Sequence, residues 1–201
     1  MKQVIKEHTF FDDLFGREIV LVDLGAARGE FSFEMSKRYP FAKGILVEPN
    51  PTNLKCIPQI PNCVVYPNLI GNNSGELNTF FEDVTLPYNG SKIFPNNNCV
   101  EHRIETITLE DIAERNNLSH IDLLKVDVEG TEYEILMSGN DHVFQMCRQI
   151  TVEFHDFVDV SLKPKTLLIL ERFKQMGFEV IANPGHWGFG TDHYDVLFYK
   201  Q

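Results

Sequence analysis

Residues 18–29 read EIVLVDLGAARG, and the fold follows from this stretch. The nearly continuous apolar run over residues 18–24 is typical of a strand that is buried on both faces, as in a parallel sheet. Glycines follow at positions 25 and 29, and Phe31 and Met35, four residues apart, indicate a short helix over residues 30–39 that ends before Pro40. A buried strand, a tight turn and a helix in this order predict an α/β protein.

The same alternation continues along the chain. Strands are expected at residues 43–47, 62–66, 121–126, 148–154, 178–181 and 195–199, and helices after Thr108, after Thr131 and over residues 163–176. The predicted fold is therefore a doubly wound, mainly parallel sheet in a single domain, residues 1–201. Within this domain we expect residues 17–155 to form the cofactor-binding and catalytic core, and residues 178–201 to supply the closing strands.

Residues 68–100 interrupt the alternation. The segment is rich in the turn residues Asn, Gly, Pro and Ser, and one antiparallel strand is expected at residues 76–81. Two interpretations are open for this insertion. Long loops on α/β scaffolds often carry function, whereas a solvated insertion would have no consequence.

Composition and charge narrow the classes of function. The 201 residues carry 18 Lys and Arg against 29 Asp and Glu, a formal net charge of −11, and no stretch clusters basic residues, so no nucleic-acid partner is expected. No apolar run reaches the ~18–20 residues that a membrane span needs. The mixed polar and charged segment 1–11 is unlike a secretory signal, which favours a cytoplasmic location. The four cysteines form no Cys-x-x-Cys pair, so zinc-ribbon and thioredoxin-like sites are not expected.

Four acidic residues stand at the ends of predicted strands: Asp23, Glu48, Asp127 and Glu153. Right-handed crossovers place the carboxyl ends of parallel strands on one edge of the sheet, and ligands bind where the strand order reverses. We therefore expect these four carboxylates to point into one crevice.

The glycine turn indicates which cofactor this crevice takes. Ala27 stands where the dinucleotide fingerprint G-x-G-x-x-G has its middle glycine. Asp23 would repel a pyrophosphate, but it suits the ammonium and sulfonium groups of S-adenosylmethionine. Glu48 stands where an acceptor for two ribose hydroxyls belongs. The sequence therefore favours S-adenosylmethionine over NAD; the alternative is a tight strand–helix turn beside a surface glutamate.

Four segments together resemble the FkbM-type family of S-adenosylmethionine-dependent methyltransferases. They are DLGAARG (23–29), VEPNP (47–51), LKVDVEGTE (124–132) and VEFH (152–155). The resemblance runs from about residue 20 to residue 155 and then fades. It implies a seven-stranded, Rossmann-like class I methyltransferase fold with an antiparallel last strand. It also implies O-methylation, often of sugar hydroxyls, glycolipids or alcohols of secondary metabolism.

Carried over by position, the resemblance assigns residues to parts of the cofactor. The glycine turn would line the methionine part, the end of the second strand would bind ribose, and the segment after the third strand would lie near adenine. Asp127 would sit at the mouth, between the methyl group and the substrate. The implied cofactor-binding residues are Asp23, Gly25, Ala26, Ala27, Gly29, Glu48, Pro49, Asn68, Ile70 and Asp127.

An alcohol nucleophile has to lose its proton, and a general base contributes typically ~10²–10⁴-fold to the rate. His155 is the expected base, because it follows the fifth strand, and Asp127 and Glu153 would orient it or accept the proton themselves. A second hypothesis uses Asp127, Glu153 and His155, with Glu129 nearby, as ligands of Mg²⁺ or another divalent cation. A purely structural histidine is the third interpretation of His155.

The late glycine-rich loop carries aromatic and imidazole side chains that suit sugar stacking, or else pack against the sheet edge: His186, Trp187, Phe189, His193 and Tyr194. The sequence thus predicts a methyltransferase that uses S-adenosylmethionine and acts on a hydroxyl of a small molecule, a sugar or a glycoconjugate. The alternatives are a protein that binds S-adenosylmethionine without catalysis, and a nucleotide-cofactor oxidoreductase, which the missing glycine disfavours.

Overall fold

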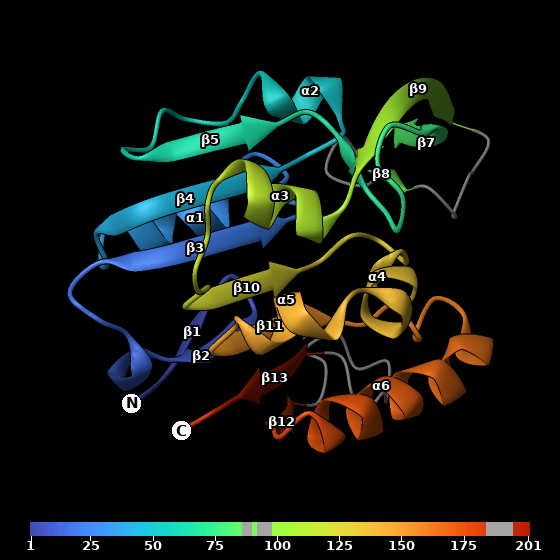
Figure 1. Cartoon of the computed structure of the whole chain (residues 1–201). Coiled ribbons are helices and arrows are strands. Elements are labelled where there is room, and N and C mark those ends of the chain that lie inside the picture. The colour runs from blue at the N-terminus through green and yellow to red at the C-terminus, as the bar shows by residue number, and fades with distance from the viewer. Residues whose placement is uncertain (86–89, 92–97, 184–194) are drawn as a thin grey trace.

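A computed structural model describes residues 1–85, 90–91, 98–183 and 195–201. A seven-stranded sheet forms its centre, in the order β12-β13-β11-β10-β3-β4-β5 (Figure 1). The strands β5, β4, β3, β10 and β11 pair in parallel, and β13 is antiparallel to both of its neighbours, β11 and β12. The predicted doubly wound α/β fold with an antiparallel last strand is therefore confirmed. The bounds are β3 (Ile19–Leu24), β4 (Phe41–Val47), β5 (Cys63–Tyr66), β10 (Leu123–Val126), β11 (Gln149–Glu153), β12 (Glu179–Asn183) and β13 (Asp195–Tyr199).

Two apolar clusters cover the two faces of the sheet. Along β3, the side chains of Val22 and Leu24 belong to one cluster, and those of Ile19 and Leu21 belong to the other. This alternation is the period of two that a strand imposes, and it explains why a strand between two layers is apolar throughout. The first layer holds α3 (Leu109–Arg115), α4 (Glu132–Ser138), α5 (Asp141–Gln145) and α6 (Lys163–Gln175), and the second holds α1 (Glu30–Ser36).

A β-hairpin that the sequence pattern did not predict completes the second layer. Its strands are β1 (Lys2–Ile5) and β2 (His8–Phe11), joined by Lys6 and Glu7, which have φ angles of 46° and 72°. Positive φ at both central residues is what a two-residue hairpin turn requires. The buried amide of Gln149 on β11 accepts from the backbone nitrogen of Phe11 at 2.7 Å and donates to its carbonyl at 3.0 Å. The hairpin is therefore fixed to the central sheet.

The insertion over residues 68–100 contributes to a second sheet. Its order is β6-β9-β7-β8, with β6 (Leu69–Ile70), β7 (Leu77–Asp83), β8 (Gly90–Ser91) and β9 (Cys99–Ile107). The expected strand at 76–81 is present as β7, and it pairs with β9 in antiparallel register from Leu77 opposite Glu105 to Asp83 opposite Cys99. The sheet lies beyond the carboxyl ends of β4 and β5 in Figure 1. Much of the insertion is therefore a structured wall beside the ligand-binding edge.

Three shorter elements complete the described part of the chain: α2 (Pro51–Leu54) and the 3₁₀ turns η1 (Asp12–Leu14) and η2 (Val160–Leu162). None of the helices within the described ranges combines the length and the apolar composition that crossing a bilayer requires.

Candidate active site

Two cavities adjoin the carboxyl ends of β3, β4 and β10. The first, with a volume of about 90 Å³, is lined by the β3–α1 turn, the end of β4, the segment after β10 and the second sheet. The second, of about 390 Å³, lies between the N-terminal hairpin, the start of α1 and the end of β10. Both are lined by Gly25, Ala27 and Asp127, so one elongated ligand can span them.

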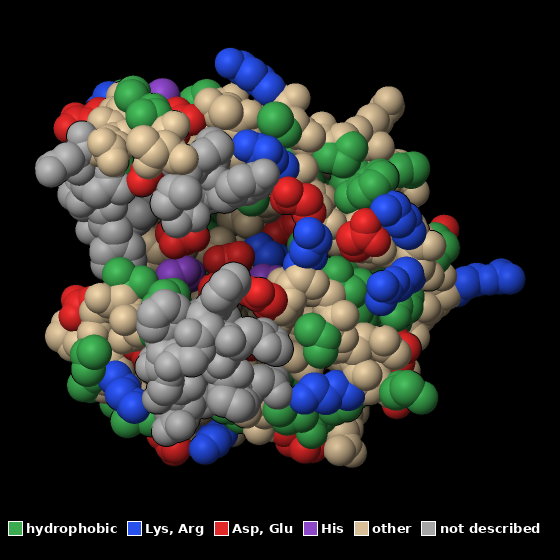
Figure 2. Space-filling model, turned by 180° about the vertical axis from the view of Figure 1, so that it is seen from behind, with side chains coloured by type: hydrophobic (Ala, Val, Ile, Leu, Met, Phe, Trp, Pro, Cys, Tyr) green, Lys and Arg blue, Asp and Glu red, His purple; other side chains and the backbone are tan. Residues whose placement is uncertain are grey.

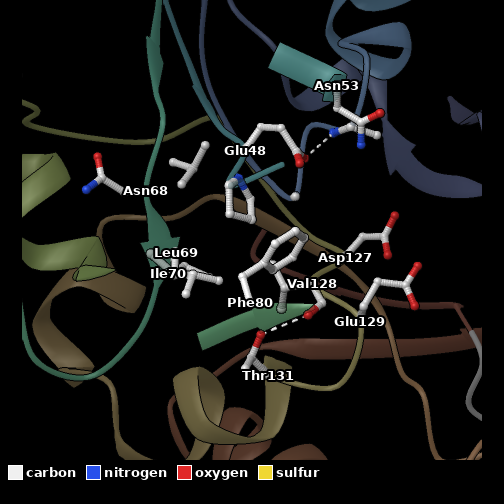
Figure 3. A pocket seen from close by; sticks show the side chains of 14 residues that line it. Glu48, Asn53, Asn68, Leu69, Ile70, Phe80, Asp127, Val128, Glu129 and Thr131 are labelled. Atoms are coloured by element: carbon white, nitrogen blue, oxygen red, sulfur yellow. Dashed lines mark hydrogen bonds between the residues drawn. The ribbon is translucent and has the colours of Figure 1, made fainter. Parts of the chain in front are cut away.

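Glu48 forms one wall of the first cavity and is buried. Its carboxylate accepts from the backbone nitrogens of Ala27 at 2.7 Å and Asn50 at 2.8 Å, the former drawn in Figure 3. Burial raises the pKa of Glu48 to about 7, although these hydrogen bonds act in the opposite direction. Asn53, from α2, lines the same cavity, and its buried Oδ1 has no hydrogen-bond partner among the described residues. The two oxygens of the Glu48 carboxylate have lone pairs beyond those used by these backbone donors, so they fit a ligand that donates two hydrogen bonds.

The β3–α1 turn is held against the end of β10. Gly25 has a φ of 76°, and a Cβ atom there would lie 1.7 Å from the carbonyl oxygen of Asp127, so a glycine is required at this point. Ala27 has a φ of 48°, a left-handed conformation that is costly for a residue with a side chain. The backbone nitrogen of Ala27 nevertheless donates to the carboxylate of Glu48, so the turn connects the ends of β3 and β4.

Apolar side chains form the opposite wall of the first cavity, namely Leu69 and Ile70 from β6, Phe80 from β7 and Val128 after β10. Figure 3 shows them at one end of the cavity, with Asp127 and Glu129 side by side at another edge. Asn68 also lines this cavity, but its amide points away and donates to the carbonyl of Glu105 at 3.0 Å. A contact between adenine and Asn68 would therefore involve its backbone or aliphatic carbons, whereas the side chain of Ile70 lines the cavity.

Asp23 does not occupy the crevice that the sequence predicted for it. Its side chain is completely buried, accepts from the Ser32 hydroxyl at 2.6 Å and forms an ion pair with the Lys125 ammonium at 3.1 Å. The reason is the register of the sheet, in which Asp23 and Lys125 are partners on neighbouring strands β3 and β10. A carboxylate held in this way compensates a buried cation and is not exposed to a ligand.

Asp127 lies directly after β10, where the two cavities meet. Its Oδ2 is 3.4 Å from the Lys125 ammonium and 3.6 Å from Nε2 of His8 in the N-terminal hairpin. Burial alone would raise the pKa of Asp127, but the Lys125 ammonium together with His8 and His155 holds this pKa below its ordinary value. Asp127 is therefore an ionised carboxylate that accepts hydrogen bonds and is a poor base.

The structure argues against His155 as the general base. The imidazole is buried, with Nδ1 3.1 Å from a carboxylate oxygen of Glu132 and Nε2 3.3 Å from one of Glu129. Burial would lower the pKa of His155, but these two carboxylates raise it well above its ordinary value. Both ring nitrogens thus carry protons that are donated to glutamates, and an imidazolium cannot accept a further proton.

The hypothetical metal ligands separate into two groups. One group, with ligand atoms within 4.8 Å of one another, consists of His8, Asp127 and Glu153, and the other consists of Asp127, Glu129 and His155. Within the described ranges, Glu153 and His155 do not share a group. The Lys125 ammonium beside Asp127 and the imidazolium of His155 already neutralise these carboxylates. The predicted set of Asp127, Glu153 and His155 therefore does not fit a divalent cation.

Figure 2 shows acidic side chains, histidines and a basic side chain gathered in a hollow in the middle of one face. Sequence reasoning missed two contributors to this region, His8 and Phe80, because each comes from a strand whose pairing the local pattern did not indicate. The aromatic and imidazole residues expected to contact a sugar, His186, Trp187, Phe189, His193 and Tyr194, lie outside the described residues.

The chain is similar to known methyltransferases in sequence and in fold. Residues 23–180 match the methyltransferase FkbM domain family. Methyltransferase sdnD of Sordaria araneosa is 25% identical over 92% of this chain and 83% of its own, and methyltransferase 1 of Beauveria bassiana is 26% identical over 89% and 77%. The solved structure of methyltransferase FkbM from Methylobacillus flagellatus is similar with a TM-score of 0.57 and 15% identity, over 92% of this chain and 44% of that chain. The present chain thus spans less than half of that solved protein.

Proposed function

The chain belongs to the FkbM methyltransferase family, and from this premise we propose that it transfers a methyl group from S-adenosylmethionine to a hydroxyl group of a small molecule. The observation that carries the proposal is the cradle made by Glu48 and Asn53. The carboxylate of Glu48 forms a wall of the cavity that the β3–α1 turn shares with Asp127, and Asn53 lines the same cavity. Two adjacent ribose hydroxyls are donors of the kind that a carboxylate in this position accepts.

The residues around this cradle would hold the remaining parts of S-adenosylmethionine. Ile70, Phe80 and Val128 supply apolar and aromatic surface for adenine. The turn at Gly25 and Ala27 leads from the first cavity to the second, which has room for the amino-acid end. Asp127 lies where the cavities meet, so the reacting centre belongs beside this carboxylate.

When bound, S-adenosylmethionine supplies a methyl group on a sulfonium leaving group, so positioning accounts for much of the rate. The protein then has to bind the acceptor hydroxyl, orient it and remove its proton. Asp127 is suited to orienting the hydroxyl, because it is ionised and partly exposed, with a side-chain exposure of 25%. The proton acceptor has to be another group, because a carboxylate paired with the Lys125 ammonium is a poor base.

We further propose a sugar or a glycoconjugate as the acceptor. Three carboxylates, those of Asp127, Glu129 and Glu153, lie close to the proposed reacting centre. Each carboxylate accepts hydrogen bonds from neighbouring hydroxyl groups, and a polyhydroxylated acceptor offers several at once. A net charge of −11 opposes a phosphate-rich acceptor, which supports a neutral sugar over a nucleic acid.

Calorimetric titration with S-adenosylmethionine, S-adenosylhomocysteine and NAD tests the cofactor, and radiolabelled methyl transfer to a panel of monosaccharides and methyl glycosides tests the reaction. We expect the two adenosyl ligands to bind and NAD not to bind. We expect Glu48→Gln to weaken binding and His142→Gln, an exposed histidine on α5, to leave it unchanged. Absence of adenosyl binding to the wild type would overturn the proposal. Binding without transfer to any acceptor would favour the binding protein without catalysis.

A further inference from the structure

We propose that His8 of the N-terminal hairpin is the general base that removes the proton of the acceptor hydroxyl. This inference rests on the proposed methyl transfer and adds the residue that the reaction still needs. His8 lines the second cavity, and its Nε2 lies 3.6 Å from Oδ2 of Asp127. Ligand atoms of His8, Asp127 and Glu153 lie within 4.8 Å of one another, so an acceptor oxygen oriented by Asp127 is within reach of the imidazole.

The surroundings of His8 orient its ring. Nδ1 lies 3.5 Å from the Thr151 hydroxyl, at the outer limit of a hydrogen bond, and this hydroxyl donates its proton to Asp195 at 3.3 Å. A threonine that donates to a carboxylate offers its oxygen lone pairs to a donor, which favours a hydrogen on Nδ1 of His8, whereas Asp127 beside Nε2 favours a hydrogen on that nitrogen when no acceptor is bound. Nε2 is the nitrogen on the side of Asp127, and an acceptor hydroxyl placed between the two groups can donate its proton to Nε2 when this nitrogen carries no hydrogen. With its hydrogen on Nδ1, the ring can accept a proton at Nε2 without first changing its tautomer.

The hairpin that carries His8 is held rigidly. The Thr9 hydroxyl donates to Asp195 at 2.6 Å, and the Gln149 amide fixes the backbone of Phe11. The rings of His8 and Phe31 form a T-shaped pair with a centroid distance of 5.4 Å and an interplanar angle of 82°. These contacts come from β11, β13 and α1, so three elements of the core position one imidazole at the cavity.

The other two candidates are less suited to accept a proton. The nitrogens of His155 both face glutamates, and Asp127 is paired with the ammonium of Lys125. A proton accepted by His8 creates an imidazolium 3.6 Å from the carboxylate of Asp127, which stabilises it. Asp127 therefore assists in two ways, by orienting the acceptor and by stabilising the charge that develops on His8.

The step balances without any further reagent. The acceptor oxygen forms a bond to the methyl carbon while the carbon–sulfur bond breaks, and the bonding electron pair stays on sulfur. The hydroxyl proton passes to Nε2 of His8, which becomes an imidazolium. The proton is released to solvent after the products leave, so the sulfonium charge ends as a solvated proton.

Nitrogen-15 NMR of the histidine rings in the cofactor-free protein tests the orientation of His8 without any need for turnover. The His8 signals are identified by their loss in His8→Gln, with His142→Gln as the matched control at a distant, exposed histidine. We expect a hydrogen on Nδ1, with shifts that change when S-adenosylhomocysteine is added. A neutral ring protonated at Nε2, or shifts that ignore the ligand, would overturn the assignment.

Methyl transfer by the same variants tests the role. We expect His8→Gln to lose about 10²–10⁴-fold in kcat, measured at saturating S-adenosylmethionine so that any change in cofactor affinity does not enter. Added imidazole should restore part of the rate of His8→Ala, which a role in folding alone would not allow. Full activity of folded His8→Gln would contradict the proposal. Failure of the wild type to bind either adenosyl ligand would instead overturn the proposed function, so the two failures are distinguishable.

Discussion

The ammonium of Lys125 lies 3.1 Å from a carboxylate oxygen of Asp23, and the two side chains are 4% and 0% exposed. The same ammonium donates to the carbonyl of Gly25 at 2.9 Å and lies 3.4 Å from Asp127. Burial would lower the pKa of Lys125, but Asp23 and Asp127 raise it above its ordinary value. One cation thus joins strand β3, the turn that follows it and the end of β10.

Removing this cation should destabilise the protein strongly. In Lys125→Met the carboxylate of Asp23 remains buried without its partner, and breaking a buried pair in this way costs about 3–5 kcal/mol. Asp23→Asn combined with Lys125→Met should recover part of the loss, because the uncompensated charge is gone. Urea unfolding of the four proteins of this double-mutant cycle measures the coupling. Additive losses would show that the two side chains do not interact.

Gly25→Ala should damage both the fold and the binding of S-adenosylhomocysteine. The new Cβ would lie 1.7 Å from the carbonyl oxygen of Asp127, so the turn must separate from β10. Overpacking of this kind costs about 1–3 kcal/mol in addition to the left-handed conformation. Gly177→Ala is the matched control, because its φ is +87° and its Cβ would meet nothing within 4 Å. Calorimetry should show weaker binding of S-adenosylhomocysteine in Gly25→Ala and unchanged binding in Gly177→Ala. Urea unfolding should show a smaller loss of stability in Gly177→Ala, because only the left-handed backbone conformation is strained there.

The buried strands and the acids at their ends could be predicted from the sequence because both depend on local pattern. The run before Gly25 is apolar throughout, and Glu48 follows directly from a strand of the same kind. The burial of Asp23 could not be predicted, because it depends on the register that places Lys125 opposite it on another strand.

The surroundings of His155 and His8 could not be predicted from the local sequence pattern either. His155 follows a predicted strand, but the two glutamates that bind its ring come from the segment after β10 and from α4. His8 stands in a mixed polar segment without a clear strand period, and its place in the site depends on a hairpin anchored by Gln149, a contact 138 residues apart in sequence. Contacts of this range have no signal in a single sequence.

Glu48 predicts a dependence of stability on pH in the range 4.5 to 7. Its pKa rises from 4.5 to about 7 on folding, so the native protein holds a proton that the unfolded chain has lost between these values. Stability therefore falls as pH rises through this window, by up to about 3 kcal/mol for a shift of this size. Urea unfolding should show this slope in the wild type and a smaller slope in Glu48→Gln.

The same carboxyl should make cofactor affinity depend on pH. Ribose hydroxyls donate to the ionised form of Glu48, so the affinity for S-adenosylhomocysteine should increase as pH rises through about 7. Glu48→Gln should bind more weakly and lose this dependence. Calorimetry in buffers on both sides of this value measures the effect. An affinity that is independent of pH in the wild type would show that Glu48 does not bind the ribose.

Glu132→Gln should destabilise the protein and release His155. The Glu132 side chain is 0% exposed, and it accepts from the ring and the backbone nitrogen of His155 and, at 2.8 Å, from the backbone nitrogen of Gly130. Removing one partner of such a buried pair costs about 3–5 kcal/mol. Because folding raises the pKa of His155, its contribution is complete below the ordinary histidine pKa and is lost as pH rises through the folded value. We therefore expect the loss in Glu132→Gln to be largest in acid and to shrink in alkali.

Glu129→Gln provides the matched comparison, because Glu129 faces the other nitrogen of His155 from a side chain that is 35% exposed. Solvent weakens such a pair, so its loss should cost far less than that of Glu132. Nitrogen-15 NMR should show a doubly protonated His155 ring well above the pH at which an ordinary histidine titrates, and a lower titration in Glu132→Gln. Titration of wild-type His155 at the ordinary histidine pKa would mean that the ring is not held as an imidazolium. His155 would then again be a candidate for the general base.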